Sequence, residues 1–338
     1  MELLQNKYTQ GKPYQLAQEI TNIRKLFGVH FFPISAVYLS SLLTRLCKLD
    51  DIGSIAGVTH GSRNGLETLL FEYFLNRRVV GTDISSSASY FPNLIQHDMN
   101  QALHPRIADN SLGFVFSNSW DHSNSPSSMF HNWISSLHPL SGCLVLEKQS
   151  SSGSVATTSD PFAASDDDLI ALIDDVSRQS SLGCSYVGAL ALKYVPSSII
   201  QQAGHPLIAG TATTLTELED GKAYLTDFSN PPRPRPLRHH IFIRTPSESK
   251  LMEARQLVAN INSLFDSKDP SSLQAFLSVH PSSLREISFR EDILNKVVAS
   301  YLLATALKKD VFKDTRGDQP HERNDLEDDV ERALACGA

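Results

Sequence analysis

The sequence has few cysteines and no long apolar run. Its four cysteines are scattered over 338 residues and form no Cys-x-x-Cys pair, which argues against a disulfide framework and a cysteine zinc site. Histidines and acids do not fall at metal-ligand spacing either. No apolar segment approaches the roughly 18 residues that span a membrane, and residues 1–12 lack a signal-peptide pattern. These absences predict a cytoplasmic or otherwise intracellular protein without a membrane partner.

Two catalytic signatures and a basic charge excess are also missing. The sequence contains no Gly-x-Ser-x-Gly elbow, which argues against a serine hydrolase. No Gly-Lys-Ser/Thr follows its glycine-rich loop, which argues against a phosphate-binding NTPase. The formal net charge is −7. This charge leaves a nucleic-acid partner open but does not favour a broad nucleic-acid-binding face.

What is present is the composition of a globular protein, with 41% hydrophobic and 20% charged residues. The helical spacing of apolar residues predicts an N-terminal helical segment over 1–48, with helices at Tyr14 to Phe27 and Ile34 to Leu49. An α/β domain over 49–247 follows, with a Pro-, Gly- and Thr-rich insertion at 196–238. Residues 248–338 are expected to form a C-terminal helical extension and acidic tail, and its helices are candidates for contacts in a homo-oligomer or complex.

The chain is organised around the stretch from Asp51 to Ile84. An apolar run at 52–58 leads into a turn-prone segment at 60–65, an amphipathic stretch and a second apolar run that ends on Asp83. This order predicts a strand, a glycine-rich turn, a helix and a strand with an acid at its tip, as in a nucleotide-binding βαβ unit. Asp83 lies 22 residues after Gly61, close to the roughly 20-residue spacing of a ribose-binding acid.

Strands and helices continue to alternate after Asp83. Strands are predicted at 94–99, 112–118, 143–147, 186–195 and 239–244, and helices at 126–137, 166–178 and 250–265. The nearly all-apolar run at 143–147 is typical of a strand buried in a parallel sheet. The fold class predicted from this pattern is an α/β sheet flanked by helices.

The order of these elements resembles that of the class I S-adenosylmethionine-dependent methyltransferases, over roughly Asp51 to Glu147. It is most similar to a subset whose first loop reads His-Gly-x-Arg-x-Gly-x-Glu, which here is His60 to Glu67. Three further segments carry the resemblance: 80–84 (VGTDI), 117–123 (SNSWDHS) and 160–162 (DPF). The resemblance implies a Rossmann-like methyltransferase sheet and S-adenosyl-L-methionine as cofactor.

The resemblance also implies roles for individual residues. The loop with Gly61 and Gly65 would face the methionine end and ribose of the cofactor, and Asp83, followed by Ile84, would hold the ribose hydroxyls. Asp98 would accept a hydrogen bond from the adenine amino group, with Met99 beside the ring. The rim where methyl donor and acceptor meet would be lined by Ser117, Asn118, Asp121 and His122. His60 and Arg63 would either contact the cofactor's carboxylate or tie down the loop.

Methyl transfer from a sulfonium mainly requires that donor and acceptor be held aligned. A general base is needed only for a protonated acceptor and then adds about 10²–10⁴-fold. His122, beside Asp121, is the candidate for this role; the alternative is that it caps the following helix. Asp83 has few structural explanations at its position, so a binding role is favoured for it.

Two function hypotheses remain open. The first is an active methyltransferase that acts on a small molecule, a peptide or an RNA end. The second is an inactive protein of the same fold that serves as a structural or assembly subunit. The second hypothesis rests partly on two departures from the wider family: the acid common near Thr59 is missing, and Gly113 stands where the fourth strand often begins with an acid. The long helical tail and the Pro-rich insertion also leave room for it.

Overall fold

The computed structural model describes residues 2–3, 33–49, 52–91, 93–107, 111–149, 156, 161–192 and 237–267. The predicted helix at Tyr14 to Phe27, nearly all of the insertion at 196–238 and the chain beyond 267 lie outside these residues. Within them, no helix is long and apolar enough to cross a membrane, and no group of histidines, cysteines and acids is placed to hold a metal ion.

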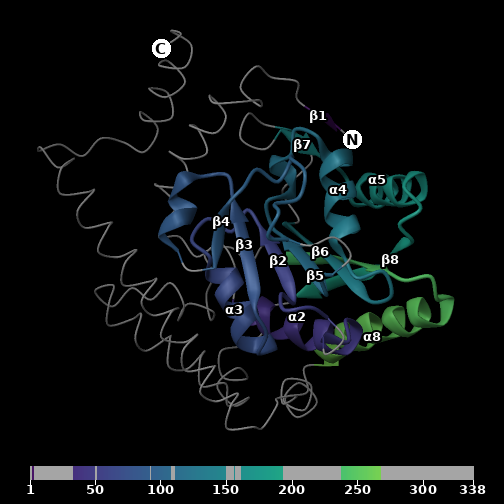
Figure 1. Cartoon of the computed structure of the whole chain (residues 1–338). Helices are drawn as coiled ribbons and strands as arrows, with labels where there is room; N and C mark the ends of the chain where they lie inside the picture. Colours follow the sequence, from purple (N-terminus) through teal and green to yellow (C-terminus); the bar gives the residue numbers. More distant parts are fainter. Residues whose placement is uncertain are drawn as a thin grey trace, which may run out of the picture.

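Seven strands form one mixed sheet in the order β4-β3-β2-β5-β6-β9-β8 (Figure 1). They are β2 (Gly57–His60), β3 (Val79–Asp83), β4 (Leu94–Gln96), β5 (Phe114–Ser117), β6 (Gly142–Gln149), β8 (Cys184–Leu192) and β9 (Leu237–Arg244). The strands β2 to β6 run parallel to one another, whereas β9 is antiparallel to both of its neighbours. This sheet confirms the predicted fold class, the Rossmann-like sheet of class I methyltransferases.

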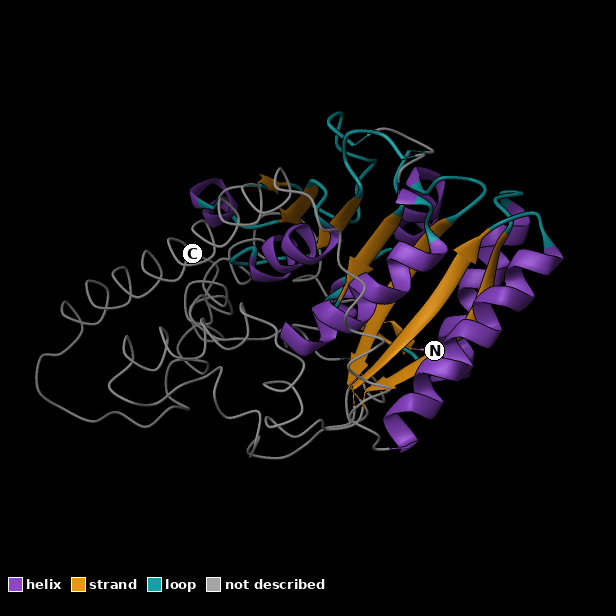
Figure 2. Ribbon diagram, turned by 90° about the horizontal axis from the view of Figure 1, so that it is seen from below, coloured by secondary structure: helices purple, strands orange, loops and turns teal. Residues whose placement is uncertain are grey.

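Helices cover both faces of the sheet (Figures 1 and 2). One apolar core lies between the sheet and α2 (Pro33–Leu46), α3 (Leu66–Leu75) and α8 (Glu248–Ser267). A second core lies on the opposite face, under α4 (Pro126–Ser136) and α5 (Asp166–Gln179). Two short 3-10 helices, η2 (Ser86–Tyr90) and η3 (Trp120–His122), follow β3 and β5. The sheet is therefore buried on both sides, as its apolar strands predict.

Local sequence signals explain where the helices begin. Pro126 occupies the first turn of α4, where a missing N–H costs nothing. The Ser165 hydroxyl caps α5 by accepting a hydrogen bond from the Asp168 N–H at 3.1 Å. Helix α3 follows Gly65, whose left-handed backbone suits glycine, and ends at Asn76, which is left-handed as well.

Most predicted strands differ from the structure by a few residues at their ends, and two of these differences bear on the site. Strand β2 begins at Gly57 rather than Ile52, because pairing to both neighbours starts at Gly57. Strand β4 ends at Gln96, so Asp98 lies two residues beyond the strand rather than on it. The short antiparallel pair of β1 (Glu2–Leu3) and β7 (Phe162–Ala163) was not predicted; its two strands are far apart in the sequence and too short to show alternation.

Candidate functional site

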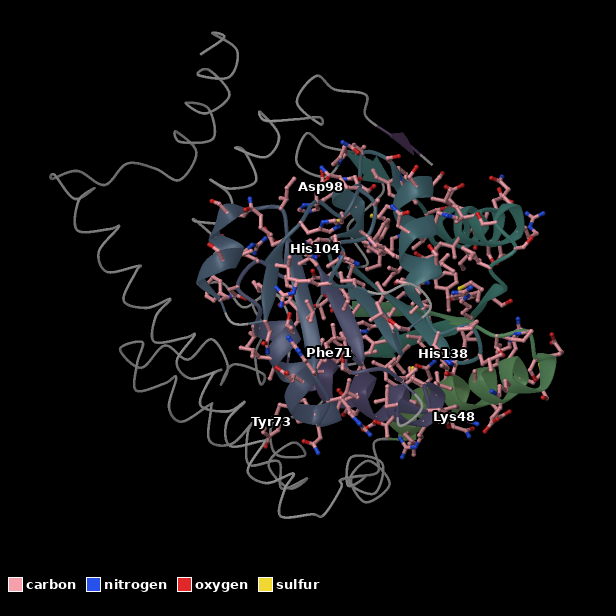
Figure 3. The ribbon with its side chains drawn as sticks, in the orientation of Figure 1. Lys48, Phe71, Tyr73, Asp98, His104 and His138 are labelled. Carbon is pink, nitrogen blue, oxygen red and sulfur yellow. The ribbon has the colours of Figure 1, made fainter. Side chains whose placement is uncertain are left out.

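The predicted site residues lie together at the carboxyl edge of the sheet, which is the side where the parallel strands end. Strands β2, β3, β4 and β5 are parallel, so their carboxyl ends share this edge, and the strand order reverses between β2 and β5. In open α/β sheets such a reversal is where ligands bind. Figure 3 labels Asp98 and His104 near this edge and Lys48 and His138 toward the opposite one.

The backbone of the first loop is bonded within the protein. The N–H groups of Gly61 and Ser62 both donate to the Thr82 carbonyl, at 2.8 and 2.9 Å. The Arg63 N–H donates to Asp83 Oδ2 at 2.9 Å. Three consecutive loop amides are thus used to join β2 to β3. They are not available to cradle a phosphate, as the amides of a dinucleotide-binding loop are.

Gly61 and Gly65 are both required by the backbone, with φ of 76° and 73°. A Cβ on Gly61 would lie 2.6 Å from the Ser119 Cβ and 3.7 Å from the Met99 side chain. One on Gly65 would lie 3.3 Å from Leu94. The two glycines let the loop pass directly beneath the segments that follow β4 and β5, which brings three predicted cofactor-contacting segments together.

Asp83 lies at the tip of β3 and is 6% exposed. Its Oδ1 accepts from the Ser85 N–H at 2.8 Å, and its Oδ2 accepts from the Arg63 N–H. Burial raises the pKa of Asp83, while these two bonds and the charges of Arg63 and His122 act in the opposite direction. An ionised carboxylate has about four acceptor positions, and these two bonds fix the orientation of the Asp83 carboxylate at the strand tip. Its neighbour Ile84 accepts from the Gln96 side chain at 3.2 Å.

His60 points into the core beneath α4. Its ring stacks on Trp133, with centroids 4.5 Å apart and planes 7° from parallel, and its Nδ1 lies 2.7 Å from the Thr82 hydroxyl. Burial, and secondarily the charge of His97, lowers the pKa of His60 to about 3. Of the two roles predicted for His60, these contacts describe the one that ties down the loop.

The charge of the Arg63 side chain interacts with those of two acids. Burial lowers the pKa of its guanidinium, and the charges of Asp83 and Glu67 act against that shift. Its backbone has a φ of 30°, an uncommon value for a residue with a side chain. Since its N–H is bonded to Asp83, this conformation serves the junction between the loop and the tip of β3.

Asp98 and Met99 follow β4. Asp98 Oδ1 accepts from both the N–H and the side-chain amide of Asn100, each at 2.9 Å. Asn100 in turn accepts from the Ser123 hydroxyl at 2.6 Å and from the Asn124 N–H at 3.1 Å. Asn100, which sequence analysis missed, therefore joins the segment after β4 to the segment after β5.

Ser117 and Asn118 occupy the end of β5. The buried Ser117 hydroxyl donates to the His60 carbonyl and accepts from the Ser119 N–H, both at 3.1 Å. The Ser119 hydroxyl donates to Asn118 Oδ1 at 3.0 Å. Ser117 thus fixes the loop after β5 to the loop after β2, while Asn118 is partly exposed at the rim.

Asp121 and His122 form part of η3. His122 Nε2 lies 4.0 Å from Asp121 Oδ1, and the two side chains are 24% and 20% exposed. The preceding Trp120 donates its indole N–H to the Glu147 carbonyl at 2.8 Å, which anchors η3 to β6. Because the charge of His122 lowers the pKa of Asp83, His122 lies near the tip of β3. The predicted general base is therefore close enough to the predicted ribose-binding acid for their charges to interact.

Sequence analysis also gave no role to three buried ionisable residues at this edge. Glu67, in the first turn of α3, is 6% exposed, and Glu147, near the end of β6, is 4% exposed. Glu147 Oε2 lies 3.0 Å from Nε2 of His239, which is fully buried. Glu67 belongs to the quoted loop motif, which was a signal for it. No local pattern pairs Glu147 with His239, since they are 92 residues apart.

Comparisons with known proteins find no matching family model and no matching curated protein. Among solved structures, the [4+2]-cyclase SpnF is 13% identical (TM-score 0.37; 62% of this chain and 81% of that chain covered). An S-adenosylmethionine-dependent methyltransferase from Aquifex aeolicus is 10% identical (0.39; 66% and 97%). Another from Thermotoga maritima is 14% identical (0.38; 69% and 99%). These values carry no functional argument, and the fold assignment rests on the strand order described above.

Proposed function

We propose that the carboxyl edge of the sheet binds S-adenosylmethionine and that the protein transfers the cofactor's methyl group to an acceptor. The observation that carries this proposal is that the side chains buried at this edge are mainly acidic. Among the described residues, the charges that act on buried Glu67 are those of two further acids, Asp83 and Glu147, and one cation, Arg63. A negative, water-poor region favours a cationic ligand, and S-adenosylmethionine carries a sulfonium and an ammonium.

The same edge does not suit a dinucleotide. A pyrophosphate adds negative charge and requires free amide donors at the loop and the helix N-terminus. Here the amides of Gly61, Ser62 and Arg63 are bonded within the protein, and the Leu66 N–H donates to Asn64 Oδ1 at 3.2 Å. The structure therefore supports a nucleoside without phosphates over a nicotinamide cofactor.

The residues at this edge fit the adenosyl group. Asp83 presents its carboxylate at the tip of β3, where ribose hydroxyls would donate to it, and Asp98 uses only Oδ1 in its bonds to Asn100. Partly buried Met99 offers an apolar surface for a flat ring. S-adenosylmethionine, when bound, supplies a methyl group on a positively charged sulfur. The remaining task of the protein is alignment at near-contact distance, which is worth roughly 7–11 kcal/mol.

The acceptor side begins at η3. For an acceptor that must lose a proton, partly exposed His122 would serve as the general base, and Asp121, 4.0 Å away, would stabilise the imidazolium. An RNA acceptor would need basic residues nearby. Of the candidates in and beside the insertion, Arg238 is bonded to Asp166 at 2.8 Å, while Lys193, Arg233 and Arg235 lie outside the described residues. The acceptor class stays open among small molecules, peptides and RNA ends.

Isothermal titration calorimetry with S-adenosylmethionine, S-adenosylhomocysteine and NAD tests the proposal. We expect micromolar binding of the two adenosyl ligands, no binding of NAD, and loss of binding in Asp83→Ala. Because Asp83 also bonds two backbone N–H groups, Asp83→Asn, which keeps one carbonyl oxygen, serves as a milder variant, and thermal melts establish that both are folded. Equal binding of S-adenosylhomocysteine by wild type and Asp83→Ala would contradict the assigned role of Asp83.

A second candidate function is that of an inactive structural or assembly subunit. It is favoured by the hydrogen bonds within the protein that already use the loop's N–H groups. It is also favoured by the two positions, Thr59 and Gly113, that lack the acid common in the family. Thr59 Oγ1 lies 2.6 Å from the hydroxyls of both Thr68 and Ser62. A Cβ on Gly113 would lie 2.8 Å from Leu49. Thr59 thus uses a hydroxyl where the family has an acid, and a side chain on Gly113 would also crowd the Ala56 carbonyl at 3.0 Å. Absence of any adenosyl-ligand binding in the calorimetry would favour this function.

A further inference from the structure

Helix α3 is buried along its whole length and on every side. All 10 of its residues, from Leu66 to Leu75, are buried. The helices on the opposite face of the sheet differ from it, since α5 buries a stripe of four residues out of 14 and α4 buries six out of 11. A helix that packs on a sheet normally keeps its outer face polar and exposed. Helix α3 is therefore covered on a face that its counterparts leave open.

The outer face of α3 is apolar. Phe71 faces the sheet, because its ring packs against two phenylalanine rings of β5 at centroid distances of 5.1 and 5.2 Å. At 3.6 residues per turn, Leu66, Leu69 and Tyr73 project from the opposite side of the helix. These three side chains are 5%, 1% and 6% exposed. Figure 3 shows Phe71 toward the strands and Tyr73 on the outer side of α3.

The neighbouring elements do not explain this burial. Among the described elements, those packed most closely on α3 are α2, β2 and β3. Helices α2 and α8 lie on the same face of the sheet and share one apolar core with α3 (Figure 1), so they flank α3 in its own layer instead of forming a layer over it. The structure holds one copy of the chain, which favours an occupant from the same chain over a second copy.

One segment outside the described residues has a composition that demands such a partner. Residues 297–307 read VVASYLLATAL, without a single charge. With helical spacing, the apolar residues of 292–308 lie around most of the helix, so cover on one face alone would leave others in water. The segment 14–27 carries Glu19, Arg24 and Lys25 and needs cover on one face only. The insertion at 196–238 is rich in Pro and Gly, which disfavour a helix.

The chain is long enough to bring 292–308 to α3. Helix α8 ends at Ser267, and residues 268–291 separate it from this segment. Fully extended, these residues span roughly 80 Å. Helix α8 packs on β8 through bonds of Asn262 to the Ala189 and Ala191 backbone. Strands β8 and β3 are separated by β9, β6, β5 and β2, which is about 24 Å at a strand spacing of about 4.8 Å.

We propose that residues 292–308 form a helix that docks on the outer face of α3, over Leu66, Leu69 and Tyr73. Each of the two helices then supplies the apolar cover that the other requires. Because α3 begins directly after Gly65, the docked segment also holds the glycine loop in place from behind. This inference is independent of the proposed function, since it involves no ligand.

Photo-cross-linking in the full-length protein identifies the occupant. With p-benzoylphenylalanine in place of Tyr73, peptide mapping by mass spectrometry should find a cross-link to 292–308 of the same chain. The same probe in place of Met252, which is 54% exposed on α8, should not reach that segment. Circular dichroism establishes that both proteins are folded. A cross-link to 14–27, a cross-linked species of twice the chain mass, or no cross-link at Tyr73 would each overturn the proposal.

Hydrogen exchange tests the docking without altering α3. Leu302→Glu in the full-length protein places a charge within the segment. The amides of α3 should then exchange at least about 10-fold faster than in wild type, while those of α5 stay unchanged. Ile20→Glu, in the alternative segment, is the matched control and should leave α3 unchanged. Unchanged exchange of α3 in Leu302→Glu, or equal acceleration in α3 and α5, would contradict docking on α3.

Discussion

Replacement of His60 by asparagine should make the stability of the protein less sensitive to acid. The His60 ring is buried, stacked on Trp133 and bonded through Nδ1 to the Thr82 hydroxyl. Its Nε2 is buried as well and has no hydrogen-bond acceptor among the described residues. A protonated ring would place an uncompensated charge in this apolar core, so the folded protein holds His60 neutral.

The size and sign of the effect follow from the pKa. Folding lowers the pKa of His60 from 6.5 to about 3, so the unfolded chain binds the proton more tightly. The contribution of neutral His60 is complete above about pH 6.5 and is lost as the pH falls toward 3. At about 1.4 kcal/mol per pKa unit the full effect is ~5 kcal/mol, of which about 2 kcal/mol is lost between pH 7.5 and pH 5.

Urea unfolding followed by circular dichroism at these two pH values measures the effect. His60→Asn should be less stable than wild type at the higher pH, because the stack on Trp133 is lost. The difference in unfolding free energy between the two proteins should narrow by about 2 kcal/mol at the lower pH. Taking the difference between variant and wild type removes the contributions of other histidines. A gap that stays constant within about 0.5 kcal/mol would refute the neutral, buried state of His60.

Glu67 supplies a comparison of opposite sign. Its pKa is raised from 4.5 to about 7, so the protonated carboxyl favours the folded state below about pH 4.5, and this contribution is lost as the pH rises through 7. In Glu67→Gln the stability should therefore fall more steeply than in wild type on acidification, by about 2 kcal/mol between pH 7.5 and pH 5.

Two further predictions concern residues outside the proposed ligand contacts. The buried Arg244 guanidinium donates to carbonyls at the end of α4, including that of Leu137 at 2.6 Å, so Arg244→Ala should cost about 3 kcal/mol in urea unfolding, with Arg244→Lys intermediate. A loss below about 1 kcal/mol would contradict it. Asn100→Ala should lower the free energy of unfolding by about 1–3 kcal/mol. It should also weaken S-adenosylhomocysteine binding, since Asn100 positions Asp98 and joins it to Ser123. Unchanged affinity would show that Asp98 needs no such support.

The sequence predicted the elements whose signals are local. The spacing from Gly61 to Asp83 predicted the first βαβ unit, and the structure has it with Asp83 at the strand tip. Pro126 marked the start of α4, and the acids after Ser165 marked the start of α5. Such signals act within a turn or a few residues of their own position, which is why they can be read without the fold.

What only the tertiary structure decided is which groups face one another across strands that are distant in the chain. His60 stacks on Trp133 across 73 positions of the sequence, and Glu147 meets His239 because β9 returns beside β6. The charge environment of Glu67 arises in the same way, from Arg63 on the loop and from Asp83 and Glu147 near the ends of two strands. Periodicity reports which face of an element is apolar, whereas the pKa of a buried group depends on burial and on charges brought close by folding. The sequence therefore determined the architecture and the edge where the predicted site residues lie, and the packing of the sheet decided the charge around them.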